Sequence, residues 1–140
     1  SNLEEFEFEE SSSLTKIESC PFTTCCNLRS LKFEYSENAE KCSVSSNLVI
    51  NTPVHHLVFP ANYVYFGNYV INMCPELLLI EFLGDELTFL GQNFRRCPKL
   101  IAVSFPNANK VTLPDDKIIG SNNCSFFFKP YANVIIKNDE

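Results

Sequence analysis

The sequence predicts an α/β solenoid with one parallel β-sheet of about six strands and short helical, 3₁₀ or irregular segments on the opposite side. Three observations predict this fold. An apolar pattern that ends in Phe recurs every 23 to 26 residues, each copy has the alternation of a short strand, and no hairpin turn separates one copy from the next. Strands without hairpins pair in parallel and need a crossover segment between them.

Six phenylalanines mark the repeats. The three clearest copies begin at Cys25, Cys74 and Cys97, with aliphatic residues three and six positions later and Phe eight positions later. A fourth copy has Asn51 in the place of the Cys. Because alternate strand residues point to opposite faces, the Phe rings should face inward and stack on those of the neighbouring coils. The repeats end near Phe8, Phe33, Phe59, Phe82, Phe105 and Phe128.

The repeats cover almost the whole chain, so we interpret residues 1–140 as a single domain. Residues 35–46, rich in Ser, Glu and Asn, do not follow the pattern and are expected to form an insertion or a long loop. Residues 131–140 would form a C-terminal cap or tail. Unpaired strand edges at the two ends of such a sheet favour self-association.

The repeated unit resembles the BspA-type leucine-rich repeat. The resemblance rests on the run Cys-x-x-Leu-x-x-Ile-x-Phe-Pro and the apolar positions before it, and it is clearest between Tyr63 and Pro106. The chain departs from the family in having Phe where the strand usually ends in Leu. The resemblance implies a curved, right-handed leucine-rich-repeat solenoid with one parallel sheet, in a family of bacterial and protozoan proteins that mostly bind other proteins.

Charge and hydropathy argue against two kinds of partner. The chain has 17 acidic and 11 basic residues, a net charge of −6, and one adjacent basic pair, Arg95 and Arg96. A nucleic-acid-binding protein uses a basic face to displace counterions from phosphates, so we expect no nucleic-acid partner. Because no apolar run approaches the roughly 20 residues that cross a bilayer, we expect no membrane span.

The seven cysteines form no Cys-x-x-Cys pair, which favours free thiols over a disulfide set or a zinc site. We therefore expect no metal and no cofactor. The odd number of cysteines, and an acidic start unlike a signal peptide, favour the cytoplasm over the cell surface. Motifs of nucleophilic or phosphate-binding catalysis are absent from the sequence, so we expect no catalytic residues and no enzyme activity. A thiol- or zinc-dependent enzyme is the least favoured alternative.

The candidate binding site is the outward face of the predicted sheet. A solvated sheet face should be polar, yet apolar residues gather in the middle of this one, as they do at protein interfaces. We expect a protein partner of unknown identity, oriented by Lys32, His56 and Glu81. The alternatives are adhesion at a cell surface and a tail that folds over the patch. The predicted binding residues are Lys32, His56, Val58, Leu79, Glu81, Leu83, Ser104 and Phe127.

Overall fold

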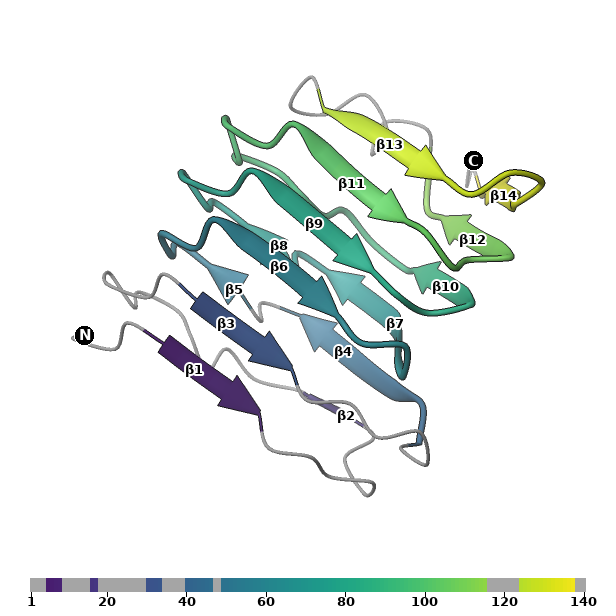
Figure 1. Cartoon of the computed structure of the whole chain (residues 1–140), viewed down its shortest axis with the longest axis horizontal. Coiled ribbons are helices and arrows are strands. Elements are labelled where there is room, and N and C mark those ends of the chain that lie inside the picture. Colours follow the sequence, from purple (N-terminus) through teal and green to yellow (C-terminus); the bar gives the residue numbers. More distant parts are fainter. Residues whose placement is uncertain are drawn as a thin grey trace.

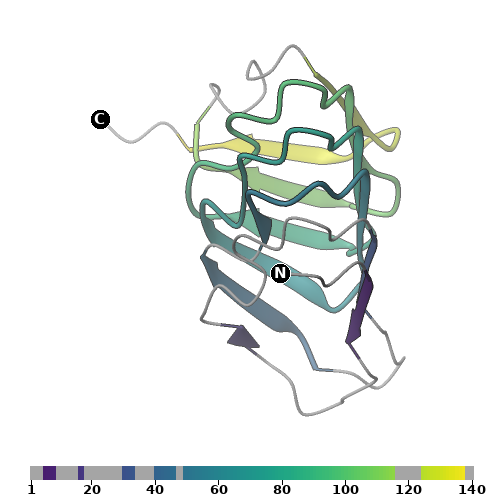
Figure 2. The ribbon, with the colours of Figure 1, turned by 90° about the vertical axis from the view of Figure 1, so that its left-hand side faces the viewer.

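The computed structural model describes residues 5–8, 16–17, 30–33, 40–46, 49–115 and 124–137, and in these residues the chain coils into a solenoid (Figure 1, Figure 2). Each strand pairs in parallel with the equivalent strand of the next coil. One side of the solenoid is a six-stranded sheet, here called the first sheet. In spatial order its strands are β1 (Glu5–Phe8), β3 (Ser30–Phe33), β6 (His56–Phe59), β9 (Leu79–Phe82), β11 (Ala102–Phe105) and β13 (Ser125–Phe128).

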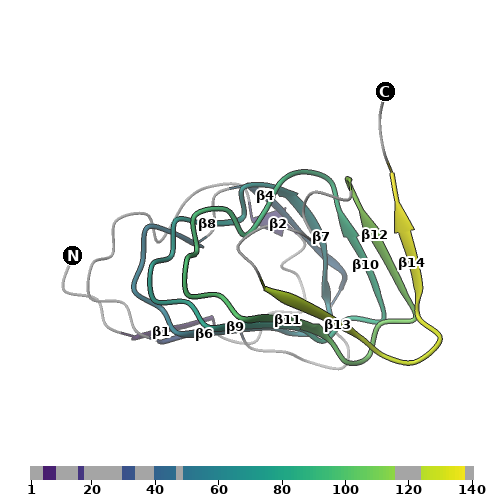
Figure 3. The same ribbon diagram turned by 90° about the horizontal axis from the view of Figure 1, so that it is seen from above.

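A second six-stranded parallel sheet forms another side of the coils, and a two-stranded sheet lies on a third side, across the solenoid from the first sheet (Figure 3). The second sheet contains β2 (Lys16–Ile17), β4 (Cys42–Ser46), β7 (Tyr63–Asn68), β10 (Glu86–Phe89), β12 (Lys110–Leu113) and β14 (Asn133–Ile136). The two-stranded sheet contains β5 (Val49–Ile50) and β8 (Ile71–Asn72).

The predicted parallel-strand repeat solenoid is confirmed, but its single sheet and helical segments are corrected. The described residues contain no helix, and the second sheet takes the place of the expected turns. The helical prediction rests on Phe94 lying three residues before Cys97. The alternation of buried Leu87, half-buried Thr88 and buried Phe89 makes a strand instead, because inward residues two apart suit a strand and not a helical turn.

Phenylalanine rings from the first sheet stack in a column, as the sequence predicts. The centroids of Phe59 and Phe82 are 5.1 Å apart, those of Phe82 and Phe105 are 5.5 Å apart, and those of Phe105 and Phe128 are 5.1 Å apart. The interplanar angles lie between 5° and 11°. For Phe8 and Phe33 the backbone register is the matching one, but their side chains are outside the described part of the structure.

A second column, from the second sheet, interlocks with the first. Phe66 and Phe89 stack with centroids 5.0 Å apart. Each of these rings meets Phe82 edge to face, at 5.0 Å and 5.1 Å. Edge-to-face and offset stacked pairs are the favourable aromatic geometries, so the core between the two sheets is a zipper of rings that no single coil could form.

The small buried residue at the turn toward the first sheet is Thr52 in one coil and Cys74 and Cys97 in the next two. The register of β5 with β8 puts Thr52 beside Cys74, with 3.8 Å between Oγ1 and Sγ. The sequence alignment, which gives this place to Asn51, is therefore wrong by one residue. Asn51 is the exposed residue before it, in the left-handed region at a φ of 54°, and Arg96 takes the same conformation before Cys97 at 57°.

Two segments that lack the repeat pattern contribute strands to the second sheet. β4 lies within residues 35–46, where the sequence predicts an insertion or loop, and its Cys42 and Val44 are buried on either side of half-buried Ser43. β14 lies within residues 131–140 and pairs with β12. The solenoid therefore continues through both segments wherever the structure describes them.

Candidate functional site

The predicted binding residues belong to strands of the first sheet, apart from Leu83, which directly follows β9, and the strand register aligns them in rows. Along β6, β9 and β11 the inward residues are buried and those between them are exposed or half-buried. Parallel pairing places equivalent residues side by side across the strands. One row contains His56 and Leu79, and the next contains Lys32, Val58, Glu81, Ser104 and Phe127.

These residues differ in how much of the side chain is available. Phe127 is 55% exposed, whereas Leu79 and Leu83 are half-buried by their neighbours in the sheet. Leu83 follows β9 directly, and its backbone N–H donates to the carbonyl oxygen of Phe59 at 2.9 Å. The side chain of Lys32 lies outside the described residues, so its orienting role stays a prediction.

His56 and Glu81 form a diagonal pair across β6 and β9. His56 Nε2 is 3.4 Å from Glu81 Oε2, and the two side chains are 49% and 34% exposed. A surface pair of this kind contributes about 0–1 kcal/mol to stability. Its main effect is therefore to hold a carboxylate and an imidazole together between the apolar residues of the two rows.

The structure adds two residues that the sequence interpretation missed. Leu78 and Ile101 lie one residue before β9 and β11, and they are 43% and 66% exposed. The N–H of Ile101 donates to the carbonyl oxygen of Leu78 at 3.0 Å, so the two lie in the same place in adjacent coils. The signal for them is an aliphatic residue immediately after the inward Leu77 and Leu100. They extend the apolar surface beyond the strand starts.

The outward face of the second sheet has a different character. Its central row pairs Tyr65, Thr88, Thr112 and Ile135. Tyr65 is 45% exposed, Thr88 and Ile135 are half-buried, and Thr112 is buried. The adjoining row pairs exposed Glu86 with exposed Lys110. Leu90, directly after β10, is 69% exposed, and Ile136 at the end of β14 is 39% exposed, so apolar side chains are exposed at both sheets. The charged pair of Glu86 and Lys110 is what distinguishes the outward face of the second sheet.

Four cysteines lie in the described part of the chain, and all four are free thiols, as predicted: Cys42, Cys74, Cys97 and Cys124. Cys74 donates to the carbonyl oxygens of Val49 and Asn72, with sulfur–oxygen distances of 3.6 and 3.5 Å. A hydrogen bond from the Cys97 thiol lowers the pKa of Cys74, against the effect of burial, and raises the pKa of Cys97 itself. The contacts of Cys74 hold a corner of the fold and leave no open path to a substrate, since the residue is fully buried.

Two further observations concern metal binding and membrane crossing. No group of three or more His, Cys, Asp or Glu side chains within the described ranges is arranged to hold a metal ion. No helix with the length and apolar character needed to cross a bilayer occurs in the same ranges.

Comparisons with known proteins identify no relative of this chain. Neither a protein-family model, nor a curated protein, nor a solved structure matches this chain in our comparisons.

Proposed function

We propose that the chain is a non-catalytic protein-interaction module that binds a partner protein on the outward face of the first sheet. The observation that carries this proposal is the set of apolar side chains on this face. Half-buried Leu79 lies beside the more exposed Leu78 and Ile101 where β9 and β11 begin. Leu83 follows the other end of β9, and Phe127 lies two strands away in the row of Glu81 and Ser104. Exposed apolar side chains among polar groups are typical of interaction sites.

The sheet also suits binding because its backbone needs no reorganisation. Every strand of the middle coils is held by neighbours on both sides, so the outward side chains start from a fixed register. A preorganised surface loses less conformational entropy when a partner binds. The apolar residues would supply the buried contacts, and His56 and Glu81 would set the orientation of the partner.

The resemblance of the repeats to the BspA-type leucine-rich repeat supports a protein as the partner, and membership of that family is part of the proposal. The unit Cys-Pro-x-Leu-x-x-[Ile/Val]-x-Phe, present at Cys74 and Cys97, carries this resemblance. The second six-stranded sheet differs from the single parallel sheet that the resemblance implies.

The test is to replace Leu79 and Leu83 together by Asp and to compare partner capture from native cells, by affinity purification and mass spectrometry, with that of the unaltered chain. We expect the double variant to lose the proteins captured by the unaltered chain, because two carboxylates cannot be buried in an apolar interface without a large desolvation cost. Circular dichroism and thermal unfolding establish that the variant is folded.

The matched control is Tyr65→Asp with Ile136→Asp, which adds the same two charges to exposed apolar residues of the second sheet. We expect this control to retain the captured proteins. Retention by the Leu79/Leu83 variant, or equal loss in both variants, would show that the first sheet is not the binding surface.

A further inference from the structure

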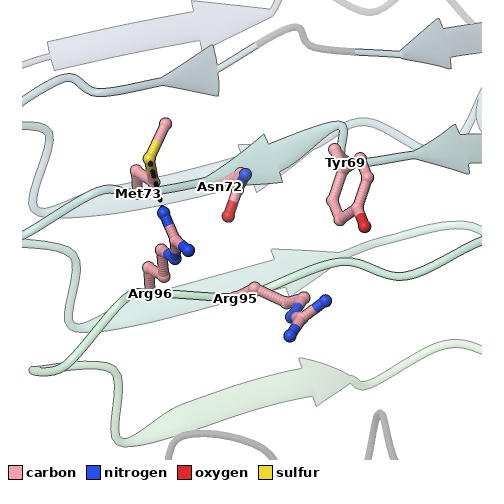
Figure 4. Close-up of a pocket in the computed structure, with 5 residues that line it drawn as sticks. All are labelled: Tyr69, Asn72, Met73, Arg95 and Arg96. Carbon is pink, nitrogen blue, oxygen red and sulfur yellow. Dashed lines mark hydrogen bonds between the residues drawn. The ribbon is translucent and has the colours of Figure 1, made fainter.

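The adjacent arginines noted in the sequence line a hollow on the third side of the solenoid. The hollow has a volume of about 240 Å³ and is lined by Tyr69, Asn72, Met73, Arg95 and Arg96 (Figure 4). Two successive coils build it, since Asn72 and Arg95 form a parallel backbone bridge. The two-stranded sheet that borders the hollow lies across the solenoid from the first sheet (Figure 3). A protein partner bound on the first sheet would therefore leave the hollow open.

The charge of this hollow is opposite to that of the protein. The chain carries a net charge of −6, but the lining contains two guanidinium groups and no carboxylate. Both arginines are exposed, and neither forms an ion pair with another residue in the described part of the chain. Among the described residues, no acidic side chain neutralises the positive charge of Arg95 and Arg96, which is available to a ligand.

Within the described ranges, Arg95 and Arg96 use little of their hydrogen-bonding capacity. Arg96 Nη1 donates to the thioether sulfur of Met73 at 3.8 Å, and sulfur is a weak acceptor that an oxygen anion can replace. The hydroxyl of Tyr69 points toward the coil that carries Arg95 (Figure 4). Guanidinium groups present paired N–H donors in a planar fork that matches the two oxygens of a carboxylate or phosphate.

The backbone fixes where these side chains leave the corner. Tyr69, Met73 and Arg96 have φ values of 56°, 52° and 57°, in the left-handed region that Gly and Asn occupy at lower cost. Met73 and Arg96 directly precede Cys74 and Cys97, as Asn51 directly precedes Thr52, so this conformation recurs at the corner of successive coils. The repeat itself therefore brings Met73 and Arg96 together at the hollow.

We propose that this hollow binds a small oxyanion, a carboxylate or a phosphate group, through the guanidinium groups of Arg95 and Arg96 and the hydroxyl of Tyr69. The volume of about 240 Å³ is well above the roughly 10–15 Å³ of cavity that one water molecule needs, so a small oxyanion with part of its hydration shell fits. The site lies on a different side of the solenoid from the protein-binding face and does not depend on it.

The experiment is a titration of the ¹⁵N-labelled full chain with sodium phosphate and, separately, with sodium acetate, followed by amide chemical shifts at constant ionic strength. We expect saturable shifts at Tyr69, Asn72, Arg95 and Arg96 with at least one of the two anions, and the tighter one identifies the preferred oxyanion. If neither anion saturates, the proposal is wrong.

The test variant is Arg95→Gln with Arg96→Gln, which should weaken binding at least tenfold. Gln keeps much of the length of Arg and makes the same demand on the backbone at residue 96, and thermal unfolding checks the fold. The control is Lys110→Gln with Lys137→Gln, which removes the same charge from an exposed residue of β12 and from the exposed residue directly after β14, and it should leave the affinity unchanged.

Equal weakening in both double variants would mean that net charge alone attracts the anion, and it would overturn the proposal. The Leu79→Asp and Leu83→Asp variant should bind the anion as the unaltered chain does. This outcome separates the oxyanion site from the proposed protein-binding face, because either one can fail while the other stands.

Discussion

Two regions of the same coils, the aromatic core between the large sheets and the polar corner beside β8, are held together by different forces. In the core, Phe82 contacts rings above, below and across from it. In the corner, Asn93 is 1% exposed and bonds only to backbone: its Oδ1 accepts from the N–H groups of Val70 and Ile71 at 2.8 and 3.2 Å, and its Nδ2 donates to the carbonyl oxygen of Gly67 at 2.9 Å.

The difference follows from the backbone. Within the sheets, the backbone groups pair with neighbouring strands, so the side chains are free to be apolar. At the corner the chain turns out of the second sheet, and buried side chains satisfy backbone groups that have no strand partner. We therefore expect the core to respond to lost volume and the corner to respond to lost hydrogen bonds.

The largest effect is expected from Phe82→Ala. Removing a fully buried ring that packs between both columns should lower the free energy of unfolding by about 3–5 kcal/mol, measured by urea denaturation. Phe128→Ala is the matched control in the last described coil, where the ring is only half-buried and packs against Phe105 and Phe126. It should lower that free energy by about 1–2 kcal/mol. Equal losses would mean that stacking on both sides adds nothing to the core.

The next largest effect tests the corner. Asn93→Ala removes little apolar contact, but it takes a hydrogen-bond partner from two N–H groups and from the carbonyls of Gly67 and Gly91, so the free energy of unfolding should fall by about 2–4 kcal/mol. Asn107→Ala removes one exposed hydrogen bond to the carbonyl oxygen of Leu83 and should lower it by less than about 1 kcal/mol. If the two substitutions had similar effects, hydrogen bonding would not explain the corner.

The core could be predicted from the sequence much better than the corner. The regular spacing of Phe59, Phe82, Phe105 and Phe128 reports directly on stacking, because a ring can be buried in every coil only when the coils are in register. The role of Asn93 leaves no such trace, since one amide in one coil satisfies backbone groups of the coil before it. A repeat pattern in the sequence therefore predicts contacts that recur in every coil, and it does not predict a contact made in one coil only.

The same limit applies to the candidate site. The alternation of inward and outward residues was enough to place Leu79 and Glu81 on one face. Leu78 and Ile101 were missed because they precede the strands, where alternation does not apply. The juxtaposition of Tyr69 with Arg95 depends on the bend between β7 and β8, whose left-handed residues are not glycines and so carry no obvious sequence signal.

A smaller effect is expected where the corner meets the second sheet. A Cβ added at Gly91 would lie 2.7 Å from Asn68 Oδ1 and 2.8 Å from Asn68 Cα, so the backbone of the neighbouring coil has to move. Gly91→Ala should therefore lower the free energy of unfolding by about 1–3 kcal/mol, measured by chemical denaturation. At Gly84 the nearest atom is Leu87 Cδ2 at 2.9 Å, the end of a side chain that can rotate, so Gly84→Ala should be milder. The reverse order would contradict the close packing of the coils at Gly91.

The smallest effect concerns the thiol that lies among apolar residues. Burial raises the pKa of the Cys42 thiol to about 11, and burial followed by the charge of ionised Cys42 raises the pKa of Tyr63 to about 12. No hydrogen bond from another side chain offsets burial at Cys42 in the described residues, in contrast to Cys74 in the corner. Apolar packing alone therefore makes Cys42 a weaker acid.

The sign of the pH dependence follows from these pKa values. As pH rises, the unfolded chain loses the Cys42 proton first, near pH 8.5, while the folded chain keeps it to about 11. The stability linked to the protonated thiol is thus complete below about pH 8.5 and is lost as pH rises toward 11. Urea denaturation of the unaltered chain at pH 8 and pH 10 should show lower stability at pH 10. Cys42→Ala should show a smaller difference between the two pH values, whatever it loses at both through the cavity, because no thiol remains to titrate. If the difference were unchanged, other groups would account for the alkaline loss, and burial among apolar residues would not be what distinguishes Cys42 from Cys74.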